Sequence, residues 1–130
     1  MEGSIHFELE KPEPEVVLKL AENLSGQKCL QWEWHYGKKV FSDQDKHHAE
    51  VKLKWEKEDI FIHKIKRNFR KEKEIRSFLD GKGLFLWSGS LYGVQGDISV
   101  WIADHFQELS EVGIRIEMEI NGRSYFPGKP

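Results

Sequence analysis

The chain has 130 residues, with 20 Lys or Arg against 22 Asp or Glu and a formal net charge of −2. This balance lacks the excess of positive charge expected of a dedicated nucleic-acid-binding domain, and a single cysteine excludes an internal disulfide. No apolar run approaches the roughly 18 to 20 residues that cross a bilayer, and the acidic N-terminus does not resemble a signal peptide. We therefore expect one cytoplasmic domain over residues 1–130 with no membrane contact.

The first third of the chain predicts a strand, a helix and a second strand. Residues 4–10 alternate apolar and polar side chains, which is the period of two expected of a strand. Pro14 then opens a segment that ends at Gly26, and acidic residues surround the proline as at a helix N-terminus. Its apolar residues recur at helical spacing: Val17, Leu20, Ala21 and Leu24. Residues 29–36 alternate again and form the clearest strand of the sequence, with 40–41 as a short continuation or an edge strand.

Residues 49–67 predict a β-hairpin. Val51, Leu53 and Trp55 alternate with charged residues, and a β-prone run resumes at Ile60 after the polar residues 56–59. The second half of the hairpin is apolar on both faces where it begins. We therefore expect it to lie deeper in the sheet than the first half.

The second half of the chain predicts two helices and further strands. Asn68 is a suitable cap for a short basic helix over 69–79, and residues 84–87 are apolar on both faces, which indicates a central strand. Residues 97–111 fit a helix capped by Asp97, and a strand over 98–102 is the alternative. Residues 114–120 alternate, and the Asn-Gly pair at 121–122 favours a tight hairpin turn into 123–126.

Together these segments predict an α+β fold. The expected order is strand, helix, three strands, helix, strand, helix and two strands. We expect one mainly antiparallel sheet of about six to seven strands, with two to three helices packed on one face.

No constellation in the sequence points to catalysis or to a cofactor. Metal-ligand side chains gather in one loop region, which contains Asp43, Asp45, His47, His48 and Glu50. Adjacent residues of a strand point to opposite faces, so the histidine pair is poorly placed to share an ion, and we expect neither a metal nor a cofactor. Cys29 and His35 are separated by roughly 20 Å along one strand, too far for a nucleophile and its base. A small enzyme or ligand-binding protein with a pocket near these side chains stays an alternative.

A basic segment raises a further alternative, nucleic-acid binding. Cations there are interleaved with aromatic residues, the combination that neutralises phosphates and stacks on bases. The candidate contacts are Lys64, Lys66, Arg67, Arg70, Lys71 and Lys73. The near-neutral charge of the chain and the expected burial of the aromatics count against this alternative.

Surplus tryptophan and segregated charge favour protein binding. The chain holds five Trp, and residues 97–120 carry one Arg against six acidic residues. Trp dominates binding hot spots, and an acidic surface suits a basic partner. The expected contact residues are Trp32, Trp34, Trp55, Asp104, Glu108 and Glu111. We therefore expect a small protein-binding module, of the kind seen in stoichiometric inhibitors and immunity proteins, that is a monomer or a homodimer.

Overall fold

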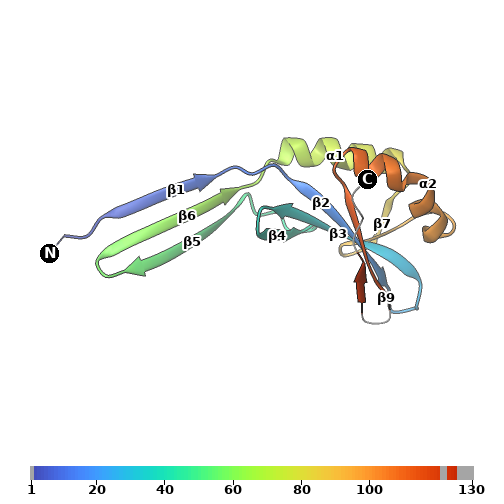
Figure 1. Cartoon of the computed structure of the whole chain (residues 1–130), viewed down its shortest axis with the longest axis horizontal. Helices are drawn as coiled ribbons and strands as arrows, with labels where there is room; N and C mark the ends of the chain where they lie inside the picture. The colour runs from blue at the N-terminus through green and yellow to red at the C-terminus, as the bar shows by residue number, and fades with distance from the viewer. Residues whose placement is uncertain (1, 121–122, 126–130) are drawn as a thin grey trace.

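The computed structural model describes residues 2–120 and 123–125. Within them the chain is α+β, with two helices and with strands that form a three-stranded and a seven-stranded sheet. Figure 1 shows the three-stranded sheet extending away from the helices, and we call this sheet the arm. We call the seven-stranded sheet together with both helices the body.

The body sheet is organised around two long central strands. β2 (Glu15–Glu22) pairs antiparallel with β3 (Lys28–Tyr36) and parallel with β9 (Arg115–Ile120). The strand order is β10-β9-β2-β3-β8-β7, and β4 also pairs with β3. The remaining bounds are β4 Lys39–Ser42, β7 Phe85–Ser88, β8 Leu91–Gly93 and β10 Arg123–Tyr125.

The core lies between the body sheet and the helices α1 (Phe69–Gly81) and α2 (Ile98–Glu111), which both lie on one side of the sheet (Figure 1). The register places Leu18 of β2 opposite Trp32 of β3, and both side chains are buried. The core also takes side chains from the helices: Leu79, Ile98, Trp101, Ile102 and Leu109. The sheet face that alternation predicted to be apolar is therefore the face that the helices cover.

The arm contains β1 (Ile5–Glu10), β5 (Ala49–Glu56) and β6 (Asp59–Lys66). β6 is the central strand, parallel to β1 and antiparallel to β5, so the predicted hairpin and the deeper placement of its second half are confirmed. The hairpin turns through Lys57, whose φ of 56° is in the left-handed region. β1 pairs with β6 although the paired residues are more than fifty positions apart in the chain. No feature of the sequence predicts this pairing.

Residues 15–22 form a strand, so the prediction of a helix after Pro14 is wrong. Val16, Val17 and Leu18 are all buried, which is the pattern of a strand covered on both faces, and β-branched residues favour that setting. Leu24, which the helical pattern placed on an apolar face, is fully exposed in the turn before β3. The pairing of β2 with β3 and β9 outweighs the local helical spacing.

Residues 85–88 form an edge strand, so the prediction of a central strand there is wrong. β7 pairs only with β8 within the described part of the chain, and Phe85 and Leu86 are each 48% exposed. A short apolar run is common in buried strands, but the same run can close the edge of a sheet when its hairpin partner is equally short.

Other predictions are confirmed. The α+β class, two helices on one face and mainly antiparallel pairing are present, although the strands divide into two sheets. The side chain of Asn68 caps α1 by accepting from the amide of Lys71, and Asp97 caps α2 through the amide of Ser99. Segment 97–111 is therefore helical. The turn at 121–122 and residue 126 lie outside the described residues. Neither helix in the described ranges is long and apolar enough to cross a bilayer.

Candidate functional site

One face of the arm is formed almost wholly by apolar side chains. Residues paired across neighbouring strands point to the same face of a sheet, so the registers of β1, β6 and β5 define three rows. From the tip of the arm to its base, these rows are Ile5-Ile60-Trp55, Phe7-Ile62-Leu53 and Leu9-Lys64-Val51. We call these nine residues the arm face. Lys64 is its single charged member.

The arm face is exposed to solvent. Ile5 is 71% exposed, Trp55 64% and Phe7 61%, and Val51 and Leu53 are each more than half exposed. Isolated exposed apolar residues are ordinary, but contiguous patches on this scale mark interaction surfaces. An isolated two-stranded hairpin is only marginally stable in water. Independent stability requires three or more strands with a hydrophobic face, or packing against a helix. The arm therefore exposes an apolar sheet face that the rest of the described chain leaves open to solvent.

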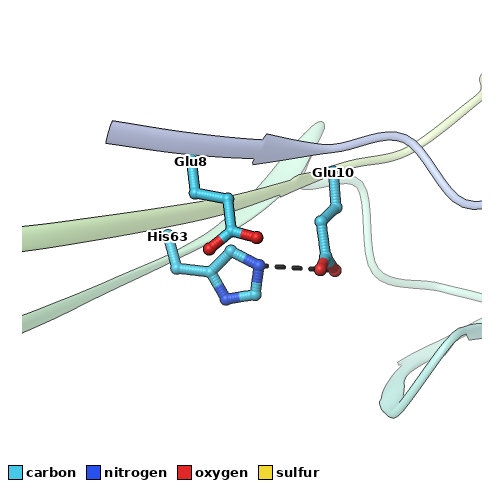
Figure 2. A group of neighbouring side chains, drawn as sticks. All are labelled: Glu8, Glu10 and His63. Carbon is cyan, nitrogen blue, oxygen red and sulfur yellow. Dashed lines mark ion pairs between the residues drawn. The ribbon is translucent and has the colours of Figure 1, made fainter. Parts of the chain in front are cut away.

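The opposite face of the arm is mostly polar, although it also carries Phe61 and Ile65, and it holds the most metal-like group of the described residues. Ligand atoms of Glu8, Glu10 and His63 lie within 4.8 Å of one another (Figure 2). This set could offer two carboxylates and an imidazole to a divalent cation. The Nε2 atom of His63 lies 3.3 Å from a carboxylate oxygen of Glu10, an ion-pair contact without hydrogen-bond geometry. The side chains of His63 and Glu10 are both partly exposed, so a partly exposed ion pair accounts for the arrangement.

The arm joins the body through a buried arginine. The guanidinium of Arg67, at the end of β6, donates two hydrogen bonds to the carboxylate of Glu72 in α1, at 2.8 and 3.0 Å. Its remaining nitrogen donates to the carbonyl oxygens of Asp45 and His47, in the loop that leads into β5. Tyr36 of β3 also donates to Glu72. We call this group the Arg67 clasp. Because it bonds to the loop, to the helix and to the sheet, it fixes the arm relative to the body.

Aromatic rings complete the clasp. The Cζ atom of Arg67 lies 4.6 Å from the ring centroid of Phe41 and 4.7 Å from that of Phe69. A guanidinium held between two ring faces gains cation–π attraction, which is stronger when water is excluded. The side chain of Arg67 is only 1% exposed. The clasp is therefore a buried structural element in which all three guanidinium nitrogens of Arg67 donate hydrogen bonds.

A second buried carboxylate, Asp43, sits beside the clasp. It accepts hydrogen bonds from Arg76, Tyr92, Trp34 and the side chain of Gln44. A pocket of about 240 Å³ opens between the two carboxylate networks and is lined mostly by charged residues. Its two arginines are already paired with carboxylates, so the charge that this pocket offers a ligand comes mainly from the exposed Lys46 and Lys73 in its lining.

Burial changes the titration of the tyrosines in these networks. Burial raises the pKa of Tyr36 above the ordinary tyrosine range, and the hydrogen bond to Glu72 raises it further. Burial and the hydrogen bond to Asp43 raise the pKa of Tyr92 to about 12. Both hydroxyls therefore stay protonated at neutral pH and act as hydrogen-bond donors, not as bases.

The structure separates the residues that we predicted to bind a partner. Trp32 and Trp34 are fully buried beneath the helices, so their assignment to a contact surface is wrong. Both side chains lie on the face of β3 that forms the core. Fewer of the five Trp are therefore available to bind a partner than the sequence indicated. Trp55 is exposed on the arm face. The three acids lie at helical spacing on exposed positions of α2: Asp104, Glu108 and Glu111.

The structure also separates the predicted nucleic-acid contacts. Arg67 is enclosed in the clasp and Lys64 lies on the arm face, so neither joins a common basic surface. The other four cations are exposed: Lys66, Arg70, Lys71 and Lys73. Lys71 lies 3.8 Å from Glu74. The aromatic residue within this segment, Phe69, packs on Arg67 and is not a free stacking platform.

Residues considered for catalysis do not converge. Cys29 is buried, its Sγ lies 3.7 Å from the carbonyl oxygen of Ala21, and burial raises the pKa of its thiol. His35 pairs with Glu33 at 3.1 Å, and His47 pairs with Asp45 at 2.6 Å in the loop before β5. Each histidine is thus satisfied by a neighbour two residues away. A buried thiol with a raised pKa is a poor nucleophile.

The sequence predicted the strands that carry the arm face but not the exposure of that face. The alternation of 51–55 and of residues 5–9 was clear, but Trp55 was the only one of their apolar residues that we predicted to contact a partner. The signal that could have identified the surface is an excess of alternating strands over the faces that two helices can cover. Comparison of the chain with protein-family models, with curated proteins and with solved structures found no match.

Proposed function

We propose that this protein is a protein-binding module and that the arm face is its contact surface. The observation that carries the proposal is the exposure of Trp55, Leu53 and Phe7 on one face of a sheet that projects from the body. Trp and Phe contribute most to binding when their rings become fully desolvated at the centre of an interface.

The architecture supports binding in two further ways. The Arg67 clasp holds the arm in one direction, and a preorganised surface loses less conformational freedom on binding than a mobile one. The polar face of the arm, with its ion pairs, stays in water while the arm face is covered. The arm therefore has one face for contact and one face for solubility.

The acidic row of α2 supports a narrower proposal, that the protein acts as a stoichiometric inhibitor or immunity-type protein on a basic partner in the cytoplasm. Asp104 and Glu111 are exposed on this row, while Glu108 lies 2.5 Å from Lys82. Such acids raise the association rate with a positively charged surface more than they add affinity. The acidic row lies on the helix α2, whereas the arm face lies on the three-stranded sheet, so both surfaces could be used at once.

Affinity capture with a matched pair of variants tests the proposal. Leu53→Asp places a charge on the arm face, whereas Lys52→Asp changes the neighbouring residue on the polar face of the same strand. Proteins captured from cells by the wild-type chain are identified by mass spectrometry, and each complex is rebuilt from purified components. We expect a complex of defined stoichiometry that survives Lys52→Asp and is lost with Leu53→Asp. Complexes that are indifferent to Leu53→Asp would place the contact surface elsewhere.

A further inference from the structure

We propose that the protein covering the arm face is a second copy of this chain, so that two arms pack face to face in a symmetric dimer. This inference rests on the proposed function, because it names the partner of the same surface. Its basis is the size, the shape and the charge of the arm face.

The area of the arm face fits a dimer interface. Six of the nine residues are between 43% and 71% exposed, and at about 150–250 Å² for a large side chain they offer roughly 500–850 Å² per copy. Two copies would bury roughly 1,000–1,700 Å² in total, which overlaps the range for specific interfaces. Stacked sheets lie about 10 Å apart with interdigitated side chains, so two flat apolar faces can form the core of a sandwich.

The chemistry of the arm face also favours a copy over a different protein. Discrimination between partners relies on charged and polar groups, and eight of the nine residues are apolar. A dimer with two-fold symmetry needs only that the surface complement itself. A copy of the chain is moreover present wherever the chain is made, which a permanently exposed apolar sheet requires.

Lys64 selects one of the two symmetric arrangements. If both arms point the same way, β1 lies over β5, β6 lies over β6, and the two Lys64 side chains face each other away from water. If the arms point in opposite ways, each strand lies over its own copy, and Lys64 at the base lies over Ile60 and near Trp55 at the tip. Like charges in a desolvated interface are costly, whereas an ammonium beside an indole is favourable. The antiparallel arrangement therefore places the bodies at opposite ends.

The mass of the purified full-length chain in solution tests the inference. Light scattering and sedimentation over a micromolar concentration series should give twice the mass of one chain. On dilution the measured mass should fall to that of one chain. Phe7→Glu and Leu53→Glu, in the central row, should each weaken the dimer by about 100-fold, since a buried hot spot is replaced by a charge. Lys52→Glu, on the polar face, should leave the dimer intact. Circular dichroism checks that each variant keeps its strands, and the wild-type series decides the question by itself if a variant does not fold.

Cross-linking tests the arrangement. Mixed Val51→Cys and Trp55→Cys chains should be joined by a short bismaleimide, because these positions face each other when the arms are antiparallel. Mixed Val51→Cys and Leu9→Cys chains should not, and the reverse result would overturn the antiparallel arrangement. A monomer at every concentration overturns the dimer. If that monomer still binds an identified protein through Leu53, the proposed function stands without the dimer; if it binds none, both fail.

Discussion

The side chains of Arg67 and Glu72 form a two-pronged ion pair, with N–O distances of 2.8 and 3.0 Å, at the point where the arm meets the body. Both side chains are almost completely buried, at 1% and 8% exposure. Breaking such a pair leaves one charge without a partner in a site that water does not reach, which costs about 3–5 kcal/mol. The pair therefore ties the end of β6 to α1 at the junction of the arm and the body.

Replacing Glu72 tests the clasp. Glu72→Gln removes the negative charge while keeping the shape, and should lower the free energy of unfolding by about 3 kcal/mol because Arg67 stays buried and unpaired. Glu74→Gln, on the exposed side of the same helix, should change the free energy by less than about 0.5 kcal/mol. Urea unfolding of both variants measures the difference. Equal effects would show that the clasp does not hold the fold.

A leucine pair tests the assignment of residues 15–22 to a central strand. Leu18→Ala should lower the free energy of unfolding by about 2–5 kcal/mol, because Leu18 is fully buried against Trp32. Leu24→Ala should have almost no effect, since Leu24 is fully exposed. The amphipathic helix that the spacing predicted would require the opposite ranking. Thermal or urea unfolding of the two variants decides between them.

The buried tyrosines predict sensitivity to alkaline pH. The pKa of Tyr92 in the folded chain is about 12, against an ordinary value of 10.0. A group whose folded pKa is raised contributes stability that is present below pH 10 and is lost as the pH rises through 12. Tyrosinate absorbance should show this residue titrating well above pH 10, and Tyr92→Phe should remove that step. Titration of all tyrosines near pH 10 would contradict the burial of these hydroxyls.

Cys29 should be protected from thiol reagents in the native protein. Its side chain is buried in β3 and burial raises the pKa of the thiol, so little thiolate is present at neutral pH. Labelling with an aromatic disulfide should be slow in buffer and rapid in denaturant. Fast labelling of the folded chain would instead place Cys29 in an accessible site and revive the pocket alternative.

Sequence patterns predicted local structure better than they predicted layers. The hairpin of β5 and β6, the caps at Asn68 and Asp97 and the helical face of α1 follow from alternation, cap chemistry and spacing, all of which are local. The parallel pairing of β1 with β6 joins residues more than fifty positions apart, such as Ile5 and Ile60, and no local signal encodes it. The arm face exists only because of that pairing.

Burial explains the remaining errors. A basic residue at the end of a strand is ordinarily solvated, so nothing in the sequence separates Arg67 from its exposed neighbour Lys66. The carboxylate that makes the burial of Arg67 tolerable is Glu72, five residues away in α1, and no sequence feature indicated that this side chain would be buried. The alternation of Trp32 and Trp34 correctly gave them one face, but it could not tell a covered face from an open one.

The most direct measurement is carbene footprinting of the arm face in the intact protein under native conditions. Phe7, Leu53 and Trp55 are compared with Val100, an apolar residue of α2 that is 56% exposed. The account predicts that the three arm residues are labelled much less than Val100 in the wild-type chain, and that Leu53→Glu restores labelling at Phe7 and Trp55. Labelling of Phe7 and Trp55 at the level of Val100 in the wild-type protein would show that no second copy covers the arm face, and would contradict the dimer.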